Sequence, residues 1–322
     1  MAASPVDYVW RQEIAPHLAP PVRRVLDQAP AALLARAVEL RLRAGGPLQL
    51  VLAAGDVFLD HRGRPCPPAE AYRISGQVLA DCWQAACRGS VYAWEEETRQ
   101  GFLTLPGGHR LGLAGRFAVE NGRVLRLRHV GGIAVRLCRA VPGCADPVLP
   151  SLVDRKRGTV HHTLIYSPPG AGKTTLLRDL VRQISTGVPA LGLPGRRVAV
   201  IDERSEVAAC REGAAQHDLG PRTDVLDGVP KAEGILMALR ALNPEVIAFD
   251  EIGHPAEAEG VLAALYAGVR VITTAHGSSR ETLARRPALR ELAPVGVFAR
   301  FVRLAYRRGP GFVAAVEGGA RG

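Results

Sequence analysis

The chain has 322 residues, of which 47% are hydrophobic, and a formal net charge of +10 at pH 7. This length is enough for two domains of ordinary size, and the apolar content excludes an intrinsically disordered chain. No apolar run approaches the roughly 18 residues that a membrane span needs. The N-terminus lacks the basic and apolar regions of a signal peptide, so we expect a cytoplasmic protein.

The positive charge raises the question of a nucleic-acid partner. The basic residues are nearly all arginine, are spread over both halves of the chain and form no block of five. Lysine occurs only at Lys156, Lys173 and Lys231. Such a bias is as readily an effect of genome composition as a binding surface, so we expect nucleic acid to be an unlikely partner.

Cysteine spacing gives no sign of a zinc site or a redox pair. None of the six cysteines forms a CxxC pair or lies near a histidine at zinc spacing. We therefore expect a reducing compartment in which the cysteines serve as small buried residues. They are Cys66, Cys82, Cys87, Cys138, Cys144 and Cys210.

Residues 1–145 are predicted to form the smaller, N-terminal domain, of the α+β class. Short helices broken by prolines are expected up to about residue 36. Hydrophobic periodicity then predicts strands at 38–42, 48–52 and 57–59, a helix at 72–87, and strands at 101–105, 110–119, 123–127 and 133–138. Pro-Gly-Gly and Asn-Gly turns separate the later strands.

Residues 146–322 are predicted to form the C-terminal domain, after a proline-rich linker at 141–151. Strands are expected at 160–166, 197–201, 245–249 and 269–274, with helices at 174–185, 231–241, 256–266 and 279–292. This alternation predicts an α/β fold with a parallel sheet flanked by helices. Residues 300–316 are expected to add a hairpin, and 187–195 and 309–322 to be a flexible loop and tail.

The stretch SPPGAGKTT nearly matches the phosphate-binding loop GxxxxGK[ST], with Ser167 in place of the first glycine. Glycines let backbone N–H groups converge on phosphate oxygens, Lys173 supplies a charge for the β- and γ-phosphates, and the Thr174 hydroxyl can bind Mg²⁺. An apolar strand precedes the loop and an amphipathic helix follows it, which is the order required of a P-loop NTPase of the RecA-like type. The predicted ATP-binding residues are Ser167, Pro168, Pro169, Gly170, Ala171, Gly172, Lys173, Thr174 and Thr175.

A second motif, EVIAFDE, is an apolar strand that ends in two carboxylates. It is typical of the Walker B strand of such a domain. Asp250 is predicted to hold the Mg²⁺ shell together with Thr174, and Glu251 to polarise the attacking water.

Two further strands end in polar groups, at Asp202 and Glu203 and at Thr274 and His276. The carboxyl ends of parallel strands line the ligand crevice, so these carboxylates can join the Mg²⁺ and water shell. His276 or Thr274 can sense the γ-phosphate by hydrogen bonding. A solvated acidic turn and a histidine that caps its strand remain alternative interpretations.

Several runs of sequence resemble the stage III sporulation protein AA family, which belongs to the secretion-superfamily ATPases. They are ELRLRAGGPL, VYAWEEETRQGFLTLPGGHRLGLAGR, VENGRV, IDERSE, HDLGPRTDVLDGVPKAEG, TTAHG and RRPALREL, and the likeness covers most of residues 38–310. The resemblance implies a Mg²⁺-dependent ATPase, cytoplasmic and attached to the membrane through partners, that energises a channel between mother cell and forespore during endospore formation. It also implies a homo-hexamer, and a membrane protein of the sporulation channel as partner.

The resemblance assigns roles to single residues as well. Asp202 and Glu203 fit the acidic box of the relatives, and His276 fits their histidine box. The expected catalytic residues are thus Lys173, Asp202, Glu203, Glu251 and His276, and Arg110, Arg116 and Arg222 are candidates for the arginine that completes such a site. Two alternatives stay open: an ATPase that binds nucleic acid, and a nucleotide-gated scaffold with little turnover.

Overall fold

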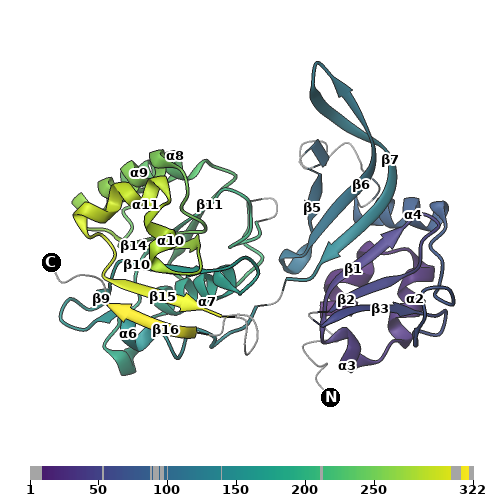
Figure 1. Cartoon of the computed structure of the whole chain (residues 1–322), viewed down its shortest axis with the longest axis horizontal. Helices are drawn as coiled ribbons and strands as arrows, with labels where there is room; N and C mark the ends of the chain where they lie inside the picture. The colour runs from purple at the N-terminus through teal and green to yellow at the C-terminus, as the bar shows by residue number, and fades with distance from the viewer. Residues whose placement is uncertain are drawn as a thin grey trace. The chain divides into compact units, whose positions relative to one another are not determined.

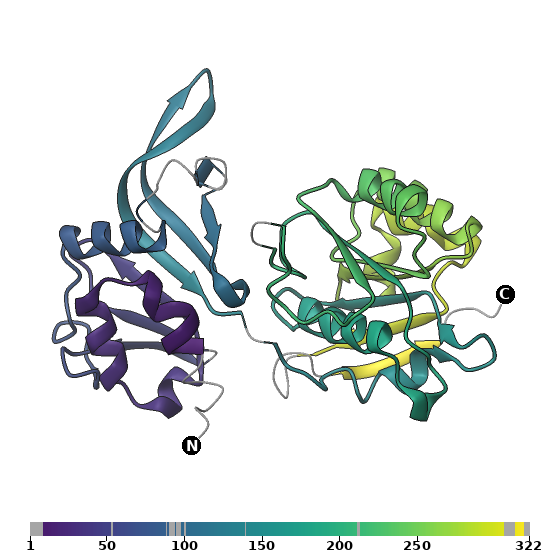
Figure 2. The ribbon, with the colours of Figure 1, turned by 180° about the vertical axis from the view of Figure 1, so that it is seen from behind.

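The computed structural model describes residues 9–52, 54–87, 89, 94, 98–99, 101–138, 140–210, 213–305 and 313–318. The chain divides into two compact units, Met1–Cys138 and Arg139–Gly322, which we call the N-terminal and C-terminal units. Each contains a seven-stranded sheet. Figure 1 shows the two units, and Figure 2 shows them from behind.

The N-terminal unit packs short helices against an antiparallel sheet of order β4-β3-β2-β1-β7-β6-β5. Apolar residues alternate along its strands, so that Leu40, Leu42 and Leu50 are fully buried in one core. The helical segments are η1 (Val9–Ile14), η2 (Ala15–His17), α2 (Pro20–Gln28), α3 (Ala31–Leu34), α4 (Gly76–Ala86) and η4 (Pro106–Gly108). The strands are β1 (Ala37–Arg43), β2 (Gln49–Leu52), β3 (Gly55–Leu59), β4 (Pro65–Cys66), β5 (Phe102–Thr104), β6 (Arg110–Glu120) and β7 (Arg123–Arg136).

Two elements of this unit differ from the prediction. The helix expected from residue 72 begins only at Gly76, because Ser75 caps it and the Tyr72 carbonyl instead accepts a hydrogen bond from the Leu48 N–H at 2.8 Å. The two strands expected at 123–127 and 133–138 are one strand, β7, whose pairing with β6 contains three bulges. In Figures 1 and 2, β6 and β7 form a long ribbon that extends beyond the helices of this unit.

The C-terminal unit is built on a sheet of order β12-β11-β13-β14-β10-β15-β16, in which only the pair β15 and β16 is antiparallel. Its strands are β10 (Thr163–Ser167), β11 (Val198–Asp202), β12 (Thr223–Asp227), β13 (Val246–Phe249), β14 (Arg270–His276), β15 (Arg300–Leu304) and β16 (Val313–Gly318), beside a small pair β8 (Val153–Asp154) and β9 (Thr159–Val160). Its helical segments are α6 (Leu149–Leu152), α7 (Lys173–Thr186), η5 (Pro189–Leu191), α8 (Lys231–Ala241), α9 (Pro255–Tyr266), α10 (Arg280–Ala284), α11 (Pro287–Leu292) and η6 (Ala293–Val295).

Helices cover both faces of this sheet, which explains why its central strands are apolar without interruption. Ile165 and Val200 face one core with α7, whereas Leu164 and Ile201 face a second core with α8, α9 and α11. The parallel sheet flanked by helices and the C-terminal hairpin of β15 and β16 confirm the predictions.

Several details of the C-terminal unit differ from the prediction. β12 was missed because TDVLD has only two apolar residues, Val225 and Leu226, and so lacks the apolar run of the central strands. The helix expected at 279–292 is two helices because Pro287 interrupts it. The segment at 187–195 was expected to be a flexible loop, but it contains η5 and its Leu193 side chain is fully buried. Of the expected flexible tail, residues 309–312 and 319–322 lie outside the described residues, and 313–318 form β16.

All six cysteines are free, and Cys82, Cys87 and Cys210 are buried. In the described parts of the chain, no helix has the length and apolar character needed to cross a membrane.

Candidate active site

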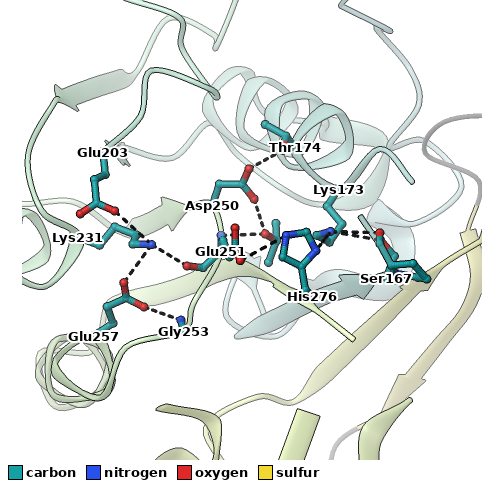
Figure 3. Close-up of polar contacts among 12 residues, drawn as sticks. Ser167, Lys173, Thr174, Glu203, Lys231, Asp250, Glu251, Gly253, Glu257 and His276 are labelled. Atoms are coloured by element: carbon teal, nitrogen blue, oxygen red, sulfur yellow. Dashed lines mark hydrogen bonds and ion pairs between the residues drawn. The ribbon is translucent and has the colours of Figure 1, made fainter. Parts of the chain in front are cut away.

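The polar residues singled out in the sequence meet where β10, β13 and β14 end. Ser167 at the end of β10 lies beside His276 at the end of β14, and Phe249 of β13 lies beside Thr273 of β14. The carboxyl edge of a parallel sheet is where α/β proteins bind their ligands. Figure 3 shows the side chains that converge there.

The phosphate loop runs from the end of β10 to the start of α7. Gly170 and Gly172 have φ angles of +76° and +92°, which side-chain-bearing residues rarely adopt, so both positions need glycine. Ser167 is the last residue of β10 and has no positive φ, and its hydroxyl donates to the Pro168 carbonyl at 2.7 Å. The serine is therefore compatible with the loop, because an extended strand residue needs no glycine.

Lys173 begins α7 and points its ammonium into the loop. Its Nζ lies 3.4 Å from the Ser167 hydroxyl, 3.4 Å from the Pro168 carbonyl and 3.0 Å from His276 Nδ1. The residue is only 6% exposed, and this burial lowers the pKa of the ammonium. Among the described residues no carboxylate lies within ion-pair distance of Nζ, so the positive charge of Lys173 is not neutralised by a salt bridge.

Asp250 accepts hydrogen bonds from the hydroxyls of Thr174 and Thr274, one on each carboxylate oxygen. Thr274 in turn accepts the N–H of Glu251 at 2.9 Å. The described residues contain no group of three or more His, Cys, Asp or Glu that could hold a metal. One carboxylate with one hydroxyl is instead the donor set expected for Mg²⁺, which keeps several waters and binds mainly to substrate phosphates.

Glu251 lies between this pair and the histidine. Its Oε1 is 3.3 Å from His276 Nε2, and an ammonium can only donate, so His276 Nδ1 must accept from Lys173. The imidazole proton then sits on Nε2 and faces Glu251, which gives a chain from Lys173 through His276 to Glu251. Glu251 has a φ of +57°, an uncommon backbone conformation for a residue with a side chain.

Asp202 is the last residue of β11, and Glu203 follows it. Asp202 is 2% exposed, and its two carboxylate oxygens accept the N–H groups of 206, 207 and 208 at 2.8, 3.0 and 2.7 Å. Burial raises its pKa although these hydrogen bonds favour the ionised form. The Asp202 carboxylate therefore holds the turn after β11, whereas Glu203 points to Lys231 at 3.4 Å. Both residues line a small cavity together with Ile201, Arg204, Glu206, Lys231, Asp250 and Glu251.

The three candidate arginines lie in different surroundings. Arg222 donates to the Ser185 carbonyl at 2.9 Å near the C-terminal end of α7, about 21 Å along the helix from the phosphate loop, so it does not reach the loop of its own unit. Arg110 stacks over the Phe102 ring at 3.5 Å. Arg116 is exposed on β6 and lies opposite His129 of β7.

Two residues of the site were missed in the sequence. Lys231 is the first residue of α8 and Glu257 lies in the first turn of α9, and the two form an ion pair at 3.0 Å beside Glu251. The scarcity of lysine was the sequence signal that pointed to Lys231. The chain has three lysines, and two of them, Lys173 and Lys231, lie at this site, whereas Lys156 is in an exposed turn.

The fold is similar to that of solved ATPases. The ATPase DotB of Legionella pneumophila has a TM-score of 0.58 at 16% identity, over 88% of this chain and 76% of that chain. DotB of Yersinia pseudotuberculosis has a TM-score of 0.56 at 13% identity, over 85% of this chain and 72% of that chain. The C-terminal unit thus has the RecA-like P-loop NTPase fold, and a smaller α+β unit precedes it, as predicted.

The sequence comparisons go further than the fold. The family model for sporulation stage III, protein AA, matches residues 9–320. Stage III sporulation protein AA of Bacillus subtilis strain 168 is 40% identical over 304 residues, which are 94% of this chain and 94% of that protein. The chain therefore belongs to the sporulation stage III, protein AA family, which confirms the resemblance seen in its motifs.

Proposed function

We propose that the protein is a Mg²⁺-dependent ATPase that hydrolyses ATP to ADP and phosphate. The observation that carries this proposal is the chain of contacts among Lys173, His276, Glu251, Asp250 and Thr174 at the end of the phosphate loop. Lys173 supplies an ammonium that forms no ion pair with a carboxylate among the described residues. Thr174 and Asp250 supply two oxygen ligands for Mg²⁺, and Glu251 supplies a carboxylate that can act on water.

The loop has the features that a nucleotide needs. Its two positive-φ glycines leave the backbone open, and the N-terminus of α7 presents free N–H groups and the positive end of the helix dipole. Thr174 and Asp250 would hold Mg²⁺, which when bound neutralises charge on the phosphate oxygens. These residues fit ATP and Mg²⁺, and together with 167–172 and Thr175 they are the binding residues that we propose.

The remaining residues have separable roles in this proposal. Lys173 leaves His276 to bind phosphate oxygens, and Glu251 orients and deprotonates the attacking water. His276 holds the Glu251 carboxylate through Nε2. Glu203 stands close enough to add charge to the water shell, and Asp202 fixes the loop that carries Glu203.

For the cellular role, we propose that turnover energises a channel between mother cell and forespore. Membership of the sporulation family, and a fold shared with solved ATPases, support this role. In this proposal the protein works as a homo-hexamer on the cytoplasmic face of the membrane, attached through a membrane protein of the channel. One of the three candidate arginines, Arg110, Arg116 or Arg222, would complete the site.

The test is ATP hydrolysis by the full chain, measured with and without Mg²⁺ and across protein concentration. We expect turnover that requires Mg²⁺, rises cooperatively with concentration, and falls at least about 100-fold in Glu251→Gln. Turnover in Glu251→Gln equal to wild type would contradict the catalytic role. ATP binding without hydrolysis, even in a single-turnover assay, would instead favour the nucleotide-gated scaffold.

An ATPase that binds nucleic acid is the second candidate, and the β6–β7 ribbon is the observation that favours it. Between Ala114 and Val130 these strands pair only with each other among the described residues. This part of the ribbon has four exposed arginines and one exposed glutamate, which are Arg116, Arg123, Arg126, Arg128 and Glu120. The ribbon has a single aromatic residue, Phe117, whereas single-strand binders stack bases on several. Duplex binding that weakens steeply with salt would support this candidate.

A further inference from the structure

Lys231, the first residue of α8, makes three contacts with its ammonium group. Nζ donates to the Glu251 carbonyl at 2.8 Å and pairs with Glu257 Oε1 at 3.0 Å and Glu203 Oε2 at 3.4 Å (Figure 3). An ammonium has three N–H donors, so these acceptors use all of them. The side chain is only 13% exposed, which leaves little room for a further ligand.

The position of Lys231 is set by close packing of α8 on the sheet. A Cβ on Gly234 would lie 2.5 Å from Ile201 Cγ2, so glycine lets this turn of α8 approach β11. The approach brings the start of α8 next to the ends of β11 and β13, where Glu203 and Glu251 follow.

Glu257 connects Lys231 to the rest of the segment between β13 and α9. Its other oxygen accepts the N–H groups of Gly253 at 2.7 Å and His254 at 3.1 Å. Lys231 therefore holds the start of this segment through the Glu251 carbonyl, and its partner Glu257 holds the end.

The backbone of Glu251 needs such support. A positive φ at a residue with a side chain persists only when the surroundings hold it. Two contacts fix the residue, since its N–H bonds Thr274 at 2.9 Å and its carbonyl accepts from Lys231. With both peptide groups fixed, the side chain leaves the backbone toward His276.

We propose that Lys231 is a positioning residue for the Glu251 carboxylate, which it places through the Glu251 carbonyl without touching the nucleotide. This inference rests on the proposed ATPase function. It adds a second lysine to the site, and its effect is on the rate of the chemical step and not on nucleotide binding.

The experiment compares Lys231→Met with wild type in the full chain, by steady-state ATP hydrolysis and by binding of ADP. A misplaced catalytic carboxylate should lower kcat about 10- to 100-fold and leave KM and the ADP dissociation constant within about threefold. The control is Lys156→Met, which removes an exposed lysine in the turn between β8 and β9 and should match wild type.

The double variant Lys231→Met/Glu251→Gln separates positioning from general loosening of the fold. If Lys231 acts through Glu251, its removal should change single-turnover hydrolysis by less than about twofold once Glu251 is already Gln. Wild-type kcat in Lys231→Met, or a loss of ADP binding equal to the loss of kcat, would overturn the inference.

Three further outcomes have a defined meaning. If Lys231→Met does not fold, as judged by circular dichroism, Lys231→Gln carries the same test, because its amide still offers a donor to the Glu251 carbonyl. If wild type hydrolyses ATP and Glu251→Gln does not, while Lys231→Met equals wild type, only this inference fails. Absence of hydrolysis in wild type would overturn the proposed function and the inference with it.

Discussion

The site contains two buried lysines whose surroundings differ in one respect. Lys231 lies within 3.4 Å of two carboxylates and 2.8 Å of a carbonyl. Lys173 has two contacts at 3.4 Å with neutral oxygens and one at 3.0 Å with an imidazole nitrogen. Lys231 forms ion pairs with two carboxylates, whereas Lys173 forms none among the described residues and feels the charges of Asp250 and Glu251 only from beyond ion-pair distance.

In the function that we propose, this difference separates a residue that binds the nucleotide from one that supports the site. A buried charge without an ion-pair partner costs free energy, and an anionic ligand can recover that cost. A lysine with all its donors occupied gains nothing from such a ligand. The predictions below follow from this contrast and are ordered by the size of the expected effect.

The largest contrast should appear in nucleotide affinity. Lys173→Ala should weaken ATP binding about 10- to 100-fold, since it removes charge-assisted hydrogen bonds worth roughly 1.5–3 kcal/mol. Lys231→Met should leave affinity within about threefold. Titration of a fluorescent ATP analogue measures both, and equal losses in the two variants would show that the lysines share one role.

Replacing the two lysines should change the free energy of unfolding in opposite directions. Lys173→Met should raise the free energy of unfolding by up to about 1 kcal/mol at pH 7, because it removes a buried charge. Lys231→Met should lower it by about 1–3 kcal/mol, because it leaves buried acceptors unpaired. Thermal unfolding without nucleotide measures both, and stabilisation by Lys231→Met would contradict the contrast.

The pH dependence supplies an internal check on Lys173. Burial lowers its pKa in the folded chain below the value of 10.5 expected when it is exposed. The unfolded chain then binds the proton more tightly, so stability rises with pH between the folded pKa and about 10.5. The free energy of unfolding of Lys173→Met should therefore exceed that of wild type by a constant amount below this interval, and the excess should shrink as the pH rises through it. Denaturant unfolding of both proteins across pH measures this difference.

The smallest effect should come from the position where the phosphate loop departs from the common pattern. Ser167→Gly should change ATP affinity and kcat by less than about threefold, because the residue is extended and its contact with Lys173 is long at 3.4 Å. Titration and steady-state hydrolysis check this. A larger loss would mean that the hydroxyl helps to hold Lys173.

How much the sequence revealed differs between the two units. The central strands of the C-terminal sheet were predicted within a few residues, because strands buried on both faces are apolar throughout. The edge strand β12 was missed since its TDVLD pattern lacks such a run. In the N-terminal unit, residues 72–75 were predicted as helix because their apolar residues continue the periodicity of α4, although Tyr72 bonds to the backbone of Leu48.

The sequence by itself determined the family, and it predicted the phosphate loop and the apolar strand followed by Asp250 and Glu251, because these depend on residue types at short, fixed spacing. It also pointed to Asp202, Glu203 and His276 as strand ends at one edge of the sheet. Tertiary structure decided what each of these side chains touches: Asp202 binds backbone N–H groups, and His276 joins Lys173 to Glu251. It alone brought in Lys231 and Glu257, because they reach the site from the starts of two helices only once those helices pack on the sheet.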